Sequence, residues 1–185
     1  SMLMNYLKKN EWLKTHETGK ELTVVMDNCS GQNKNNMVLR LANLLVECKF
    51  FKKVNMFFYI KGHTKNLCDR WFNILKRYYR VYNIYTFDDM IAKFRSHELI
   101  KVHTLKEGDF RDWEFMLELL YKRVVGILSA HIFYATDEDP GYLYSKLDNV
   151  TPSAPFNRVK MFRADGNKRV SDKLECGERR GRGWW

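Results

Sequence analysis

The sequence predicts an α/β fold with a parallel βαβ unit at its centre, and three observations lead to it. Residues 22–26 and 54–60 are short apolar runs, rich in β-branched and aromatic side chains, as in the strands of a covered sheet. Between them, residues 35–49 carry apolar side chains at helical spacing. A strand, a helix and a strand in this order predict two neighbouring parallel strands joined by a right-handed crossover.

Further helices are predicted on both sides of this unit. Residues 5–16 carry aromatic and leucine side chains among lysines and predict a leading helix. An apolar face after the second strand predicts a helix that runs to about residue 80. Thr86 is the predicted cap of a helix over residues 88–94, whose first turn holds two acids near the positive helix end. Residues 110–131 predict a long helix with one apolar side.

The remaining segments are predicted to be extended or irregular. Residues 82–85 and 99–105 suggest short strands or extended edges, and residues 135–155, which hold all three prolines, suggest a loop. From residue 163 the composition shifts to Gly, Lys, Arg and Glu, and we expect disorder there. These boundaries divide the chain into a leading helix (1–20), a core (21–135), a loop-rich extension (136–162) and a basic tail (163–185).

The composition fits one domain with a hydrophobic core and favours a polyanionic partner. Of the 185 residues, 45% are hydrophobic, and 32 Lys plus Arg exceed 22 Asp plus Glu, which gives a formal charge of +10. An ordinary solvated surface also explains such an excess. The four cysteines lack the Cys-x-x-Cys spacing of a zinc ribbon and indicate reduced thiols inside the cell. No apolar run is long enough to cross a bilayer, so we expect no membrane partner.

Each predicted strand runs into a polar turn that is associated with an acid. Asp27 directly follows the first strand, and Asp69 lies in the first turn of the helix after the second strand, with Asn73 one turn further on the same face. Carboxylates at the carboxyl ends of adjacent parallel strands suit a hard cation such as Mg²⁺. Asp27 would equally serve as the cap of its own turn. Asp69 would equally serve as an acid that interacts with the helix dipole.

Other polar residues surround these acids in the sequence. His63, at the end of the second strand, could donate to a phosphate or carry a proton, or it could be a structural histidine. The turn over residues 30–36 offers amides and a lysine at a helix N-terminus, where anions bind, although turn chemistry alone also explains it. The spacing of a P-loop is absent, which excludes an NTPase of that type. Asn28, Gln32 and Asn33 are candidate supporting residues beside Asp27.

Basic and aromatic residues alternate over residues 70–80. Part of this segment belongs to a buried face, and an ordinary amphipathic helix explains the pattern too. The outward cations could follow a phosphate backbone. The candidate nucleic-acid contacts in the whole chain are Lys34, Lys65, Arg70, Lys76 and Arg77.

The two polar turns together resemble a known family. Asp27-Asn-Cys-Ser-Gly-Gln-Asn-Lys-Asn and Gly62-His-Thr-Lys-Asn-Leu-Cys-Asp69-Arg-Trp-Phe are similar to the ribonuclease-H-like integrase core of transposase-derived eukaryotic proteins, from residue 22 to about residue 94. The resemblance implies a DDE-type mechanism, in which acids bind two Mg²⁺ or Mn²⁺ ions that activate water or a DNA 3′-hydroxyl. By position, Asp27 would follow the fourth strand and Asp69 would lie on the last catalytic helix, with DNA as partner and the nucleus as location.

One part of that family pattern has no counterpart. Such folds place a first acid on their opening strand, but only a helix is predicted before residue 22. Ser1-Met2 is typical of a tag remnant, so we expect the opening strands to lie upstream in the native chain. Three hypotheses stay open: a metal-dependent nucleic-acid-processing enzyme, a domesticated relative that holds DNA without cutting it, and a domain that assembles with another chain or with copies of itself.

Overall fold

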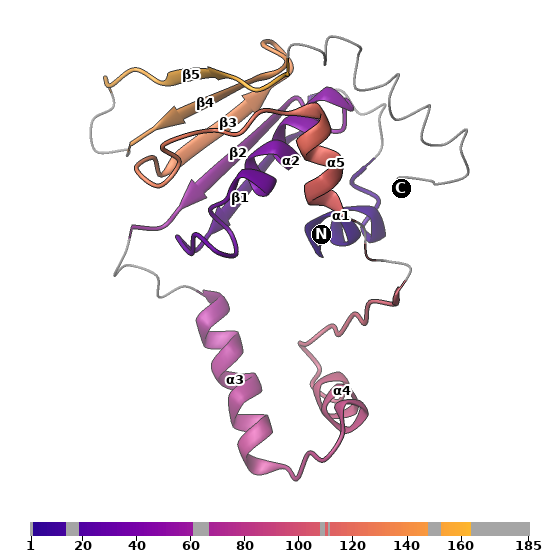
Figure 1. Cartoon of the computed structure of the whole chain (residues 1–185). Coiled ribbons are helices and arrows are strands. Elements are labelled where there is room, and N and C mark those ends of the chain that lie inside the picture. The colour runs from indigo at the N-terminus through magenta and orange to yellow at the C-terminus, as the bar shows by residue number, and fades with distance from the viewer. Residues whose placement is uncertain are drawn as a thin grey trace, which may run out of the picture. The chain divides into compact units, whose positions relative to one another are not determined.

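The computed structural model describes residues 2–13, 19–60, 67–107, 110, 112–147 and 153–163 of the chain. They belong to two compact units (Figure 1). Residues 1–62 and 111–185 form one unit, which we call the sheet unit, and residues 63–110 form the other, the helical unit. The predicted core over residues 21–135 therefore spans parts of both units.

The sheet unit is built on a five-stranded mixed sheet. The strands are β1 (Glu21–Met26), β2 (Lys53–Phe58), β3 (Ile132–Thr136), β4 (Tyr142–Lys146) and β5 (Asn157–Lys160), and they lie in this order across the sheet. β1 and β2 are parallel, with Glu21 opposite Lys53 and Met26 opposite Phe58. The other three pairs are antiparallel. The predicted pair of neighbouring parallel strands is confirmed.

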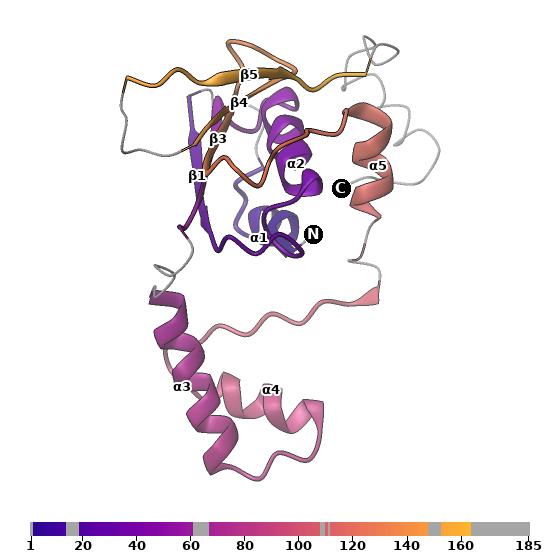
Figure 2. The same cartoon turned by 60° about the vertical axis from the view of Figure 1, so that its left-hand side comes forward.

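Three helices lie on the same side of this sheet, and α2 packs directly against it (Figure 2). They are α1 (Met2–Lys9), α2 (Asn36–Glu47), which connects β1 to β2, and α5 (Trp113–Leu120). β2 alternates between buried and half-buried residues, because successive side chains point to opposite faces of a strand. The buried residues Val54, Met56 and Phe58 pack with the apolar side of α2 in one core cluster. Confinement of this core to one sheet face explains why residues 35–49 show such a clear helical period.

The predicted long helix over residues 110–131 is wrong. Among the described residues, the helix there ends at Leu120, and Tyr121 already has extended backbone angles. The Tyr121 ring stacks on Phe162 at 5.5 Å between centroids, and the two residues form an isolated β-bridge. Beyond it, the backbone groups of Val124 bond to the side chain of Asn36. The segment thus satisfies its backbone through tertiary partners instead of helical ones.

The predicted loop over residues 135–155 is also wrong for the residues that the structure describes there. β3 and β4 form an antiparallel hairpin, and β5 adds a further strand. Tyr134 and Tyr144 stack across the hairpin at 4.6 Å, a cross-strand contact of the kind that stabilises sheets. Asp139, in the hairpin turn, accepts two hydrogen bonds from Arg158 of β5 and one from Tyr144. Pro140 and the three acids at positions 137–139 belong to a tight turn, not to a long loop.

The helical unit contains α3 (Leu67–Val81) and α4 (Phe87–Arg95). Thr86 caps α4 as predicted, and Asp89 completes a reciprocal capping box. His97 lies against the inner side of α3, where it contacts the rings of Trp71 and Tyr78 at 6.4 and 5.4 Å. The described residues 99–105 contain no strand. None of the described helices is long and apolar enough to cross a membrane. The basic tail from residue 164 lies outside the described residues.

Candidate functional site

Asp27 lies where the sequence predicts it, directly after β1 at the carboxyl end of the parallel pair. Its side chain is exposed, and its Oδ1 accepts the backbone N–H of Asn28 at 2.7 Å. This bond matches the alternative in which Asp27 caps its own turn. A carboxylate in this bond still has lone pairs on its second oxygen, so the bond does not remove its capacity to bind a cation.

The polar turn that follows is held together mainly by its own backbone. The carbonyl of Cys29 accepts N–H groups from Gln32, Asn33 and Lys34 at 2.9–3.3 Å. Asn35 caps α2 by accepting the N–H of Val38, and its amide donates back to the carbonyl of Gln32. Turn chemistry therefore explains much of this segment without a ligand.

Lys34 does not fit the exposed phosphate contact that the sequence suggested. Its side chain is 1% exposed, and its ammonium group donates to the carbonyl of Leu128 at 2.8 Å. The same group lies 5.6 Å from the centroid of the Phe58 ring. Burial lowers the pKa of Lys34, because a low-dielectric surrounding disfavours the charged form. Lys34 is a cation of the protein interior and is not available to a phosphate at the surface.

Two further polar residues of α2 have a structural role that the sequence reasoning missed. Arg40, 3% exposed, donates from Nε to the carbonyl of Lys122 and from Nη1 to Glu118 at 3.0 Å. Asn36 pairs with the backbone of Val124. A signal was present: Asn36, Arg40 and Asn43 recur at helical spacing within an otherwise apolar helix. Polar residues at such positions need partners, and here residues 118–124 supply them.

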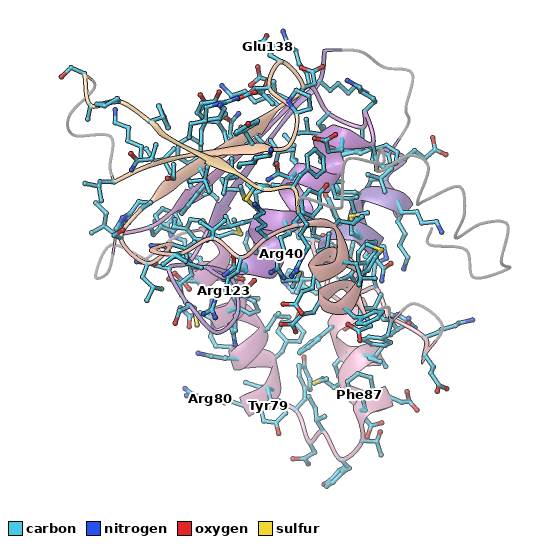
Figure 3. The ribbon with its side chains drawn as sticks, turned by 45° about the horizontal axis from the view of Figure 1, so that its top comes forward. Arg40, Tyr79, Arg80, Phe87, Arg123 and Glu138 are labelled. Atoms are coloured by element: carbon cyan, nitrogen blue, oxygen red, sulfur yellow. The ribbon has the colours of Figure 1, made fainter. Side chains whose placement is uncertain are left out.

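A cavity of about 740 Å³ opens beside this contact in the sheet unit. Arg40 and Arg123, labelled in Figure 3, both line it. Its lining also includes the acids Asp112, Glu114 and Glu118. Because Glu118 already pairs with Arg40, the lining does not favour an anion over a cation. The cavity therefore gives no support to the phosphate site that the turn suggested.

The two predicted metal ligands belong to different units of the structure. Asp27 belongs to the sheet unit, whereas Asp69 and Asn73 lie exposed on α3 of the helical unit. His63 and Lys65 fall outside the described residues. Within the described part of the chain, no group of three or more His, Cys, Asp or Glu side chains could hold a metal ion. The end of β1 offers one carboxylate, which is too few donors for a two-metal centre, so we derive no metal-dependent step.

The exposed side of α3 carries the remaining predicted contacts. Arg70, Lys76 and Arg77 are all exposed, and so is Arg80. None of these four cations forms an ion pair with a described residue. Two aromatic rings lie exposed on the same helix, Phe72 at 61% and Tyr79 at 59%. Figure 3 shows Tyr79 and Arg80 on this helix. The helical unit thus presents cations and aromatic rings together.

Comparison with known proteins gives one match. The family described as "Domain of unknown function (DUF7869)" matches residues 1–151, a span that includes the helices α1 to α5 and the strands β1 to β4. No curated protein and no solved structure matches the chain.

Proposed function

Since the chain belongs to the DUF7869 family, we propose from its geometry that it is a nucleic-acid-binding domain whose contact surface is the exposed side of α3. The observation that carries the proposal is the charge on that helix. The helix carries four cations and one acid, Asp69. All four cations are exposed, and none forms an ion pair with a described residue. A cation that is not paired within the protein is free to neutralise a phosphate.

The spacing of the cations suits a phosphate backbone. Arg77 and Arg80 share one stripe along α3 with Asn73, a neutral hydrogen-bond donor, because the three residues recur at i, i+4 and i+7. Arginine offers planar donors that bind phosphate oxygens in pairs. Neutralised phosphates release their counterions, and this release favours binding without regard to base sequence. DNA is the polyanion that the resemblance to transposase-derived proteins favours, with the nucleus as the expected location.

The test uses fluorescence anisotropy of a labelled 20-base-pair duplex with the full chain. We expect the double variant Lys76→Glu/Arg77→Glu to lower affinity at least tenfold at about 50 mM salt, whatever the duplex sequence. Lys8→Glu/Lys9→Glu changes the charge equally at the exposed end of α1 and serves as the matched control. The proposal is contradicted if the α3 variant and the α1 control lose affinity equally, or if the wild type does not bind the duplex.

The basic tail needs a control of its own. A full-length variant in which four arginines of the tail are replaced by glutamine separates the contribution of the tail from that of α3; these are Arg169, Arg179, Arg180 and Arg182. We expect this variant to keep the difference between the α3 reversal and its control. If that difference disappears, the measured affinity comes from the tail and the α3 interface is rejected.

A second function, phosphodiester cleavage with Mg²⁺ or Mn²⁺, is favoured by the exposed carboxylate of Asp27 at the end of a parallel strand pair. It requires Asp69, and in the predicted scheme His63, to act together with Asp27. Calorimetric titration with Mn²⁺ tests it: we expect Asp27→Asn and Asp69→Asn each to abolish binding. Binding that survives in either variant excludes a shared site. Loss of Mg²⁺-dependent nicking in both variants, with the fold intact, would support cleavage.

A further inference from the structure

We propose that the α3 surface binds single-stranded nucleic acid more tightly than a duplex, because unpaired bases stack on the rings of Phe72 and Tyr79. The inference rests on the proposed function and names the form of the polymer. Both rings are more than half exposed, so their faces are accessible to a partner. Neither ring contacts another aromatic ring or a cation among the described residues.

Neighbouring aromatic residues of the helical unit differ in this respect. Tyr78 contacts both Tyr82 and His97, at 5.6 and 5.4 Å. Lys93 places its ammonium group 4.2 Å from the centroid of the Tyr82 ring. These rings are occupied within the unit, whereas Phe72 and Tyr79 are not. On α3, Trp71 also contacts His97, so Phe72 and Tyr79 are the rings of this helix that are available to a ligand.

The arrangement along the helix combines stacking with charge. Phe72, Lys76 and Tyr79 recur at i, i+4 and i+7 and so share one stripe, with the cation between the two rings. Seven residues correspond to about 10.5 Å of helix, so each ring can take a separate base. The stripe with Arg77 and Arg80 runs alongside, one residue further round the helix. A strand lying along α3 can then place bases on the first stripe and phosphates on the second.

The exposed rings favour binding of a single strand over binding of a duplex. In a duplex, the base faces are already stacked on each other, so the phosphates are the groups that α3 can reach. Unpaired bases offer their faces to aromatic side chains, and this stacking accepts any base. A second copy of the chain is disfavoured as occupant, because two such surfaces would bring like charges together, four cations against one acid on each helix.

The experiment compares a labelled 20-mer of thymidylate, its fully abasic analogue and a 20-base-pair duplex, all with the full chain. The variant Phe72→Leu/Tyr79→Leu keeps apolar side chains and good helix formers. We expect it to bind the thymidylate strand at least tenfold more weakly, since each stacked base contributes a factor of about 5 or more, while duplex binding changes less than twofold. Phe72→Trp/Tyr79→Trp should retain strand binding, because tryptophan also stacks.

The outcomes separate this inference from the proposed function. Equal binding of the thymidylate and abasic strands, or no effect of the leucine variant, overturns stacking. If the Lys76→Glu/Arg77→Glu variant still weakens binding in that case, the nucleic-acid interface itself stands. Sedimentation of the leucine variant provides a further check. If wild-type dimers become monomers in this variant, a second copy covers the rings and the inference is overturned.

Discussion

The side-chain amide of Asn36 pairs with both backbone groups of Val124. Its Oδ1 accepts the N–H of Val124 at 2.7 Å, and its Nδ2 donates to the carbonyl of the same residue at 3.3 Å. The two residues are 88 positions apart in the chain. One side chain at the first turn of α2 therefore takes the place of a helical hydrogen-bond partner for the segment after α5. This contact ties the start of α2 to the segment that follows α5.

We expect Asn36→Ala to lower the free energy of unfolding by about 1–3 kcal/mol. The physical reason is that both backbone groups of Val124, itself buried, lose their partner. Urea denaturation followed by circular dichroism measures the change. Gln32→Ala, an exposed position in the preceding turn, is the control and should change stability by less than about 0.5 kcal/mol. Equal effects of the two substitutions would show that the Asn36 contact does not stabilise the fold.

Gly141 is expected to be the glycine least tolerant of alanine among those described. It has φ +77°, and a Cβ at this position would overlap the ring of Phe162. Overpacking costs about 1–3 kcal/mol, and the left-handed backbone adds about 1–2 kcal/mol. Gly126 is the matched control, because it has φ +74° but nothing within 4 Å of its Cβ position. Thermal unfolding should show a larger fall in melting temperature for Gly141→Ala than for Gly126→Ala. An equal fall in both variants would show that the Phe162 ring moves aside freely.

Glu47 should make stability depend on pH. Burial raises the pKa of its carboxyl group above the ordinary value of 4.5, against weaker opposing effects of the Gly141 N–H and Lys49. The Oε1 atom of Glu47 has no hydrogen-bond partner, and neither does the buried hydroxyl of Tyr121. Because the folded state holds this proton more tightly than the unfolded chain, protonation of Glu47 stabilises the fold. This stabilisation is fully present below pH 4.5 and is lost as pH rises through the pKa of the folded state.

The variant Glu47→Gln tests this dependence, since an amide does not titrate. We expect the variant to exceed the wild type in unfolding free energy by about 1 kcal/mol at pH 7, and the difference to shrink towards pH 4. Urea denaturation at the two pH values measures both quantities. Glu114→Gln, at an exposed position of α5, is the control. A difference that stays constant with pH would assign the effect to packing instead of ionisation.

The salt dependence of nucleic-acid binding should report single contacts of α3. A plot of log affinity against log salt concentration has a slope set by the number of neutralised phosphates. We expect Arg77→Gln to reduce this slope by about 0.7 for a single strand, while Lys9→Gln on α1 leaves it unchanged. Anisotropy titrations between about 50 and 200 mM salt measure the slopes. An unchanged slope for Arg77→Gln would place this arginine outside the interface.

Local patterns were sufficient where the structure depends on local chemistry. The parallel pair β1 and β2 was predictable, because apolar runs separated by an amphipathic helix leave one common crossover. The cap at Thr86 was predictable as well, since Thr86 and Asp89 bond to each other three residues apart. The place of Asp27 at the carboxyl end of β1 followed from the apolar run before it, although β1 is an edge strand in which Leu22 alone is buried, not the buried strand that was predicted. The positions of Arg70, Lys76 and Arg77 on an exposed helix face followed from the helical period alone.

The sequence by itself thus determined the βαβ unit, the cap of α4 at Thr86 and the basic helix, because each depends on local patterns of residues. Tertiary structure decided the end of α5 at Leu120, since Val124 bonds to Asn36 instead of continuing a helix. It also decided the burial of Lys34, whose partner Leu128 lies 94 positions away. A buried ammonium group and an interrupted helix both arise from contacts between distant segments, and no period in the sequence encodes such contacts.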